Sequence, residues 1–253
     1  MGLDIFVHSI RQVFGNFGAA LRISALLYLI QVAAVYFLGA GLLANPQLLQ
    51  MQAQRGDVPW GGLIVALLVL VVTGLWIAVA WHRYILRVEE PGSVIPAFKG
   101  DRMLSYFGYS ILIVIILILM SLVLGLVVGL VVAPFLGGSP VIGMIIIGIL
   151  VYVPLVIVGY RLSVVLPAAA LGEELGIGGA WEKTQGAMGT LLLLAIVSLI
   201  GAVVIDLPAA YVFTPGSILS IIWSAVTQWI VLMVGISILT TLYGVYVEER
   251  KLN

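Results

Sequence analysis

The sequence predicts an all-α integral membrane protein with six transmembrane helices, and three observations lead to that fold class. The 253-residue chain is 63% hydrophobic and only 9% charged, whereas soluble domains carry about a quarter charged residues. Its apolar residues form continuous runs long enough to cross a bilayer, which takes about 20 residues at 1.5 Å each. These runs lack the alternation of a transmembrane barrel strand, so strands are not expected.

The first element is expected to be an amphipathic helix from Leu3 to Phe17. Apolar residues spaced by three and four share one face of such a helix, and polar residues such as Asp4 and Arg11 fall on the other. A short helix of this kind before a span is expected to lie in the plane of the membrane interface. The apolar face comprises Leu3, Phe6, Val7, Ile10, Phe14 and Phe17.

Six apolar runs then follow, and each is predicted to be a span. The run from Met103 to Tyr160 has no charge and is too long for one span, so it is divided at its one strong turn signal, FLGGSP (135–140). Pro154 is expected to kink the span in which it lies. The predicted spans are Ile23–Leu43, Gly61–Trp81, Tyr106–Pro134, Val141–Tyr160, Thr190–Val212 and Ile218–Val245.

The basic residues predict the orientation of the bundle. Of the 11 lysines and arginines, only Arg55 lies on the side of the first, third and fifth loops. The rest lie near the termini and in the second and fourth loops. Because basic residues accumulate in cytoplasmic loops, both termini are expected in the cytoplasm.

The chain is predicted to be a single membrane domain, 1–253, with possible internal repeats at 1–83, 84–161 and 162–253. The two long cytoplasmic loops each contain a Glu-Glu pair, a glycine and an Ala-aromatic pair before the next span. We therefore expect three helical hairpins, each preceded by a short interfacial helix: Leu3–Phe17, Ala97–Arg102 and Ala180–Lys183. Chance similarity between juxtamembrane loops is the alternative.

The stretch from Arg161 to Gly186, RLSVVLPAAALGEELGIGGAWEKTQG, resembles a family of bacterial polytopic proteins. That family is similar to the membrane domain attached to some glycerophosphodiester phosphodiesterases. The resemblance implies a multi-pass protein of the bacterial inner (plasma) membrane. It does not imply phosphodiesterase activity, because the sequence has no polar, His- and Glu-rich stretch to form the soluble enzyme domain.

Four side chains at span ends are candidate lipid headgroup ligands: Arg22, His82, Arg83 and Arg161. Basic pockets between helices bind lipid phosphates. The alternative is ordinary snorkelling of long side chains to the interface. The Glu-Glu pairs at 89–90, 173–174 and 248–249 are expected to be solvated charges paired with Arg87, Lys183 and Arg250, so no metal site is predicted.

Small residues on the third span form a packing signal. Ser121, Gly125, Gly129 and Ala133 recur every four residues, and such a stripe lets another helix approach closely. An internal partner is expected, with a second subunit as the alternative. Asp206, an acidic residue within a span, is a functional candidate by default, although its place near a helix end favours contact with water.

Composition and motifs exclude several functions. A net charge of zero offers no field for nucleic acid. Without a phosphate-binding loop, HExxH or a serine elbow, no enzyme and no cofactor are expected. The leading hypothesis is a non-enzymatic protein that binds membrane lipids or a membrane-protein partner, homo-oligomers included. The alternatives are an accessory subunit of a larger complex and a passive channel or transporter for a neutral or amphipathic solute, lined by Gln31, Ser198, Thr227 and Gln228.

Overall fold

The computed structural model describes residues 1–38, 41–44, 46–92, 94–131, 140–214 and 217–252, and in that part of the chain it contains helices and no strand. Six helical segments there are long and apolar enough to cross a membrane, which confirms the predicted fold class. Their helices are α2 (Phe17–Ala33) with its π-helical continuation Ala34–Leu38, α4 (Trp60–Arg87), α5 (Gly100–Val131), α6 (Pro140–Ser163), α9 (Met188–Tyr211) and α10 (Ile218–Tyr246).

The spanning helices extend beyond the predicted apolar runs at their basic ends. Helix α4 continues six residues past Trp81, to Arg87, and α5 begins at Gly100. The expected interfacial helix Ala97–Arg102 is not a separate element, because its last residues already belong to α5. Pro96 stands just before this segment and lacks the backbone N–H that a helix interior requires. The predicted FLGGSP turn falls mostly outside the described residues.

Three short helices complete the described part of the chain: α3 (Pro46–Arg55), α7 (Val165–Leu171) and α8 (Ile177–Lys183). Of these, α7 continues α6 and forms the end of the fourth candidate span, Gly148–Leu171. Helix α3 lies in the segment between the first two predicted spans, and Pro46 occupies its first position, where proline is favoured. Helix α8 contains the predicted interfacial segment Ala180–Lys183. Helix α7 was not predicted, and all seven of its residues are buried.

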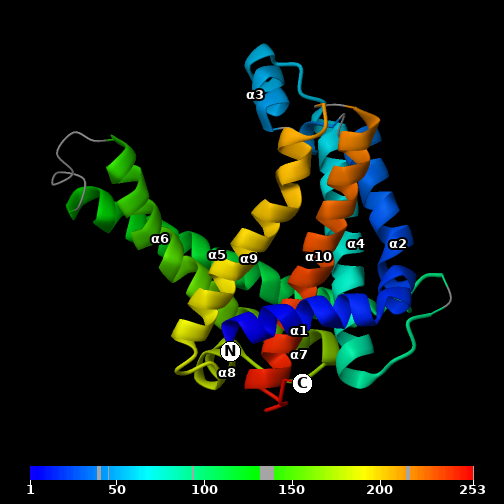
Figure 1. Cartoon of the computed structure of the whole chain (residues 1–253), viewed down its shortest axis with the longest axis vertical. Helices are drawn as coiled ribbons and strands as arrows, with labels where there is room; N and C mark the ends of the chain where they lie inside the picture. Colours follow the sequence, from blue (N-terminus) through cyan, green and yellow to red (C-terminus); the bar gives the residue numbers. More distant parts are fainter. Residues whose placement is uncertain (39–40, 45, 93, 132–139, 215–216, 253) are drawn as a thin grey trace.

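Helix α1 (Gly2–Gly15) lies across the bundle rather than alone at its edge. It runs nearly perpendicular to α2, α4 and α10 (Figure 1) and packs on α9 and α10. Its buried positions are Gly2, Ile5, Ser9 and Val13, while Leu3 and Phe14 on the predicted apolar face are exposed. A Cβ at Gly2 would lie 2.5 Å from the Thr190 carbonyl oxygen. The buried face of α1 therefore combines Gly2 and Ser9 with Ile5 and Val13, and Leu3 and Phe14 face outward.

The helices do not form one parallel bundle. Helices α2, α4 and α10 stand side by side with α9 inclined against them, while the α5–α6 hairpin extends to one side (Figure 1). The hairpin contacts α4, α7 and α9 near the end that carries the termini. Leucines along the rest of α5, such as Leu122, Leu126 and Leu130, are more than 60% exposed. These side chains face lipid if the hairpin lies in the bilayer.

A polar seam on α10 joins the elements around it. Ser237 accepts a hydrogen bond from Trp81 Nε1 (2.9 Å) and donates to Gln12 Oε1 (2.9 Å). Thr241 lies 3.0 Å from Ser9 on α1. Because buried polar groups are costly when unpaired, these bonds select one register of α10 against α1 and α4.

Single cysteines test the predicted orientation, since the chain has no cysteine of its own. Gln50 on α3 and Glu174 between α7 and α8 are exposed at opposite ends of the molecule. In intact cells a membrane-impermeant maleimide is expected to label Gln50→Cys, whereas Glu174→Cys is expected to react only after permeabilisation. The reverse pattern would contradict cytoplasmic termini, and labelling of both in intact cells would contradict a location on opposite sides.

Candidate functional site

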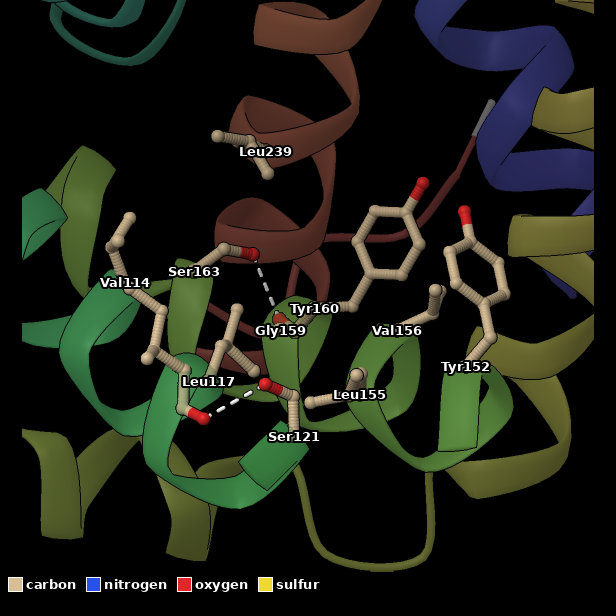
Figure 2. A pocket seen from close by; sticks show the side chains of 11 residues that line it. Val114, Leu117, Ser121, Tyr152, Leu155, Val156, Gly159, Tyr160, Ser163 and Leu239 are labelled. Carbon is tan, nitrogen blue, oxygen red and sulfur yellow. Dashed lines mark hydrogen bonds between the residues drawn. The ribbon is translucent and has the colours of Figure 1, made fainter. Parts of the chain in front are cut away.

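An apolar groove opens between α5 and α6, and Leu239 of α10 also lines it (Figure 2). Its volume is about 620 Å³. The hydroxyls of Ser121 and Ser163 donate to backbone carbonyls of their own helices, each at 2.8 Å, so they add little polarity to the wall. The groove is lined by Val114, Leu117, Ile118, Ser121, Tyr152, Leu155, Val156, Gly159, Tyr160, Ser163 and Leu239.

Within the described part of the chain, the predicted small-residue stripe on α5 is open at two of its four positions, Gly125 and Gly129. Around Gly125 and Gly129, no atom of the described part of the chain lies within 4 Å of the position of an added Cβ. Ser121 instead lines the groove, and Ala133 lies outside the described residues. The expectation of an internal helix partner therefore finds no support at these two glycines, because the hairpin diverges from the bundle at their level.

A second cavity, the outer pocket, lies between α2, α4, α9 and α10, away from the termini. Its volume is about 590 Å³. Gln31 and Gln228, two residues of the predicted solute pathway, line it together. A third, Thr227, is buried with its hydroxyl bonded to the Ser224 carbonyl (3.1 Å). The outer pocket is lined by Tyr28, Gln31, Val32, Val35, Tyr36, Leu43, Leu70, Asp206, Ser224, Ala225, Gln228 and Leu232.

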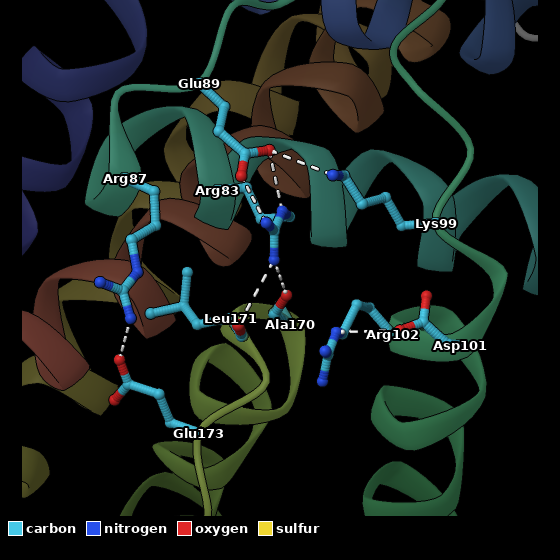
Figure 3. A network of polar contacts seen from close by, with 9 residues as sticks. All are labelled: Arg83, Arg87, Glu89, Lys99, Asp101, Arg102, Ala170, Leu171 and Glu173. Carbon is cyan, nitrogen blue, oxygen red and sulfur yellow. Dashed lines mark hydrogen bonds and ion pairs between the residues drawn. The ribbon is translucent and has the colours of Figure 1, made fainter.

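Arg83 forms a clamp on the opposite, basic side of the molecule (Figure 3). Its guanidinium pairs with both carboxylate oxygens of Glu89, with Nε to Oε2 at 2.9 Å. The remaining nitrogen donates to the carbonyl oxygens of Ala170 (2.9 Å) and Leu171 (3.4 Å), at the end of α7. The side chain is only 14% exposed. Arg83 therefore has little hydrogen-bonding capacity left for a lipid.

The end of α7 explains why an arginine is needed there. Gly172 has a left-handed backbone (φ 85°), and the amides of Gly172 and Glu173 bond back to Ala169 and Ala168. This is a Schellman motif, which leaves the last carbonyls of the helix without partners. Arg83 satisfies those carbonyls with a positive charge, which the helix C-terminus favours.

Arg161 plays the same part for α8. Its Nε donates to Thr184 Oγ1 (3.0 Å), and a terminal nitrogen donates to the Trp181 carbonyl. The guanidinium carbon lies 3.5 Å from the centre of the Trp181 ring, in cation–π contact. Two arginines at the ends of spanning helices thus hold two short helices through carbonyl groups. Arg161 is half-exposed and keeps a face toward its surroundings.

The four candidate headgroup residues are therefore not equivalent. Arg22 is exposed, and no described residue forms an ion pair or a side-chain hydrogen bond with it. His82 has no exposed surface, so this arrangement gives a lipid no access to it. We retain Arg22, which is exposed, and Arg161, which is partly exposed at the end of α6, as candidates.

His82 instead belongs to the polar seam. Thr240 donates its hydroxyl to the Ile236 carbonyl (2.9 Å) and so must accept from His82 Nδ1 (2.8 Å). His82 Nε2 then accepts from the Tyr106 hydroxyl (3.4 Å). The network thus assigns a neutral ring protonated on Nδ1. Sequence reasoning missed this role, although Ser237, Thr240 and Thr241 form a polar stripe at helical spacing.

The Glu-Glu pairs do not converge. Glu89 pairs with Arg83 and Lys99, Glu173 with Arg87, and Glu248 with Arg250. Glu173 also accepts from the Tyr243 hydroxyl. Among the described residues, no group of three or more potential metal ligands forms. Glu89 and Glu173 thereby tie the segments after α4 and α7 to α4.

Loss of the Arg83 clamp is expected to destabilise the protein. Arg83→Gln removes charged hydrogen bonds to two helix-end carbonyls and to Glu89, at a cost of about 1–3 kcal/mol. The control Arg87→Gln breaks a more exposed ion pair, with 49% and 38% of the two side chains accessible, and should cost at most about 1 kcal/mol. The thermal midpoint in detergent measures both. Equal midpoints for the two variants would contradict the clamp.

The contribution of Glu89 is expected to depend on pH. Hydrogen bonds from Arg83, aided by the charges of Lys99 and Arg87, hold the pKa of Glu89 below its ordinary value of 4.5. A carboxyl with a lowered pKa stabilises the fold above its unfolded pKa and loses that effect as pH falls through the folded pKa. The midpoint difference between wild type and Glu89→Gln should therefore be full at pH 7 and shrink below about pH 4.5. Glu90→Gln, at an exposed neighbour, should show no such dependence, and a difference constant down to pH 3 would refute the assignment.

Comparisons of this chain with protein families, with curated proteins and with solved structures find no match. The chain stands as a polytopic membrane protein with six helical segments able to span a bilayer.

Proposed function

We propose that this chain is a non-enzymatic membrane protein that binds a lipid in the groove between α5 and α6. The groove itself is the observation that carries this proposal. Its walls are apolar, and they belong to helices long enough to span the bilayer. It lies where the hairpin leaves the bundle, so acyl chains of the surrounding bilayer have direct access to it.

The chemistry of the groove fits an acyl chain. Lipid tails are as apolar as leucine, so binding within the bilayer depends on van der Waals contact rather than on expulsion of water. Leu117 of α5, Val156 of α6 and Leu239 of α10 provide such contact from three helices. Gly159 leaves open space between them, since a Cβ there would only just touch Leu117 (3.6 Å).

We place the headgroup of the bound lipid at the end of α6 that carries Arg161. Tyr160 and Ser163 line the groove there and flank Arg161 in sequence. Arg161 is half-exposed, and basic side chains between helices favour lipid phosphates. Arg83 and His82 have no part in this proposal, because both belong to α4 rather than to the helices that form the groove, and His82 has no exposed surface.

We also propose the bacterial inner membrane as the location, with kinship to the phosphodiesterase-associated membrane domains. The support is the motif from Arg161 to Gly186 and the excess of basic residues on one side. Two residues of this motif now have structural roles: Gly172 ends α7, and Arg161 holds α8.

A glycine-to-leucine pair tests the groove. Gly159→Leu fills the space between α5 and α6, and retention of phospholipid is expected to weaken about tenfold, equivalent to about 1.4 kcal/mol. Native mass spectrometry of protein purified in mild detergent counts the bound lipids. Gly148→Leu is the matched control, because Gly148 lies on the same helix with no described atom within 4 Å of an added Cβ. Equal lipid retention by the two variants would refute the proposal.

A further inference from the structure

The outer pocket is separate from the proposed lipid groove and has a different chemistry. The groove is bounded by α5 and α6, whereas the outer pocket lies among α2, α4, α9 and α10. Two hydrogen bonds hold its walls together: Tyr28 donates to the Ala225 carbonyl (2.8 Å), and Gln31 Nε2 donates to Thr73 Oγ1 (2.9 Å). Polar side chains thus converge on a cavity of ligand size in an otherwise apolar part of the protein.

Asp206 supplies the one formal charge among the residues that line this pocket. Within the described chain, no hydrogen bond or ion pair engages its carboxylate. Its position is set by a neighbouring contact, since Trp223 Nε1 on α10 donates to the Ile205 carbonyl (3.2 Å). Asp206 stands five residues before the end of α9, about 8 Å along the helix axis. Asp206 is exposed, so its carboxylate is accessible to a ligand that enters the pocket.

The rest of the lining indicates the kind of countercharge. A hard metal ion takes six or more oxygen ligands, several of them carboxylates, and the pocket offers one carboxylate. Tyr28 and Tyr36 instead present aromatic rings, which attract organic cations. Val32, Val35 and Leu232 form an apolar wall on the same cavity, suited to the hydrocarbon part of such a cation.

We propose that the outer pocket binds a lipophilic organic cation with a single positive charge, which Asp206 neutralises while the two tyrosines and the apolar wall enclose its body. The side-chain amides of Gln31 and Gln228 also line the pocket and offer hydrogen-bonding groups to a polar substituent of the cation. This site extends the protein beyond lipid binding and does not depend on the groove.

Two ions of the same shape and opposite charge test the proposal. Tetraphenylphosphonium and tetraphenylborate are titrated separately against the full chain in nanodiscs of neutral phosphatidylcholine, with empty nanodiscs as blank. Saturable binding of tetraphenylphosphonium is expected, with no saturable binding of tetraphenylborate. Asp206→Asn should weaken cation binding at least tenfold, because the amide keeps the shape and removes the charge.

Two further variants separate charge from folding. Asp206→Glu keeps the carboxylate and should retain the binding that Asp206→Asn loses. Glu174→Gln removes an exposed carboxylate elsewhere and should bind the cation like the wild type. The proposal is overturned if tetraphenylphosphonium does not bind saturably to the wild type, or if tetraphenylborate binds equally well. It is also overturned if Asp206→Asn binds the cation with wild-type affinity, or if Asp206→Glu fails to retain binding.

Discussion

The half of this protein that carries the termini depends on the contact between Arg83 and the end of α7. Helix α7 is short and wholly buried among α4, α5, α6 and α10, so its terminal carbonyls have little access to water. Arg83 pairs with these carbonyls and with Glu89 at the same time. One side chain thereby fixes α7 and the segment after α4. Because α5 packs on α7, the direction of the α5–α6 hairpin follows from this arrangement.

The basic residues of this chain consequently have two roles at once. Their distribution predicts the orientation of the protein in the membrane, and the structure shows Arg83 and Arg161 serving as partners for helix ends. The same basic character that suggested lipid phosphates suits backbone carbonyls, which are also rich in negative charge. Burial distinguishes the two arginines: the Arg83 side chain is largely enclosed, while Arg22 is exposed.

The two cavities follow from how the hairpins diverge. The α5–α6 hairpin departs from the bundle, and the groove lies along its inner side (Figures 1 and 2). Away from the termini, α2, α4, α9 and α10 enclose the outer pocket. Gln31, Asp206 and Gln228 were each recognisable in the sequence as polar residues within spans. Their convergence was not, because they come from three helices that are far apart along the chain.

The sequence by itself determined the spans, since a run of about 20 apolar residues has one stable solution in a bilayer, a helix whose backbone is satisfied internally. It also marked residues unusual for their surroundings, such as Asp206 and the glycines of α5. Only the tertiary structure decided which face of α1 is buried, that His82 lies inside the polar seam, and that Arg83 holds α7. Lipid and protein interior are equally apolar, so hydrophobic pattern cannot distinguish the two faces of a helix. Side-chain size and hydrogen-bond partners make that choice, and those partners lie up to 232 positions apart in the chain.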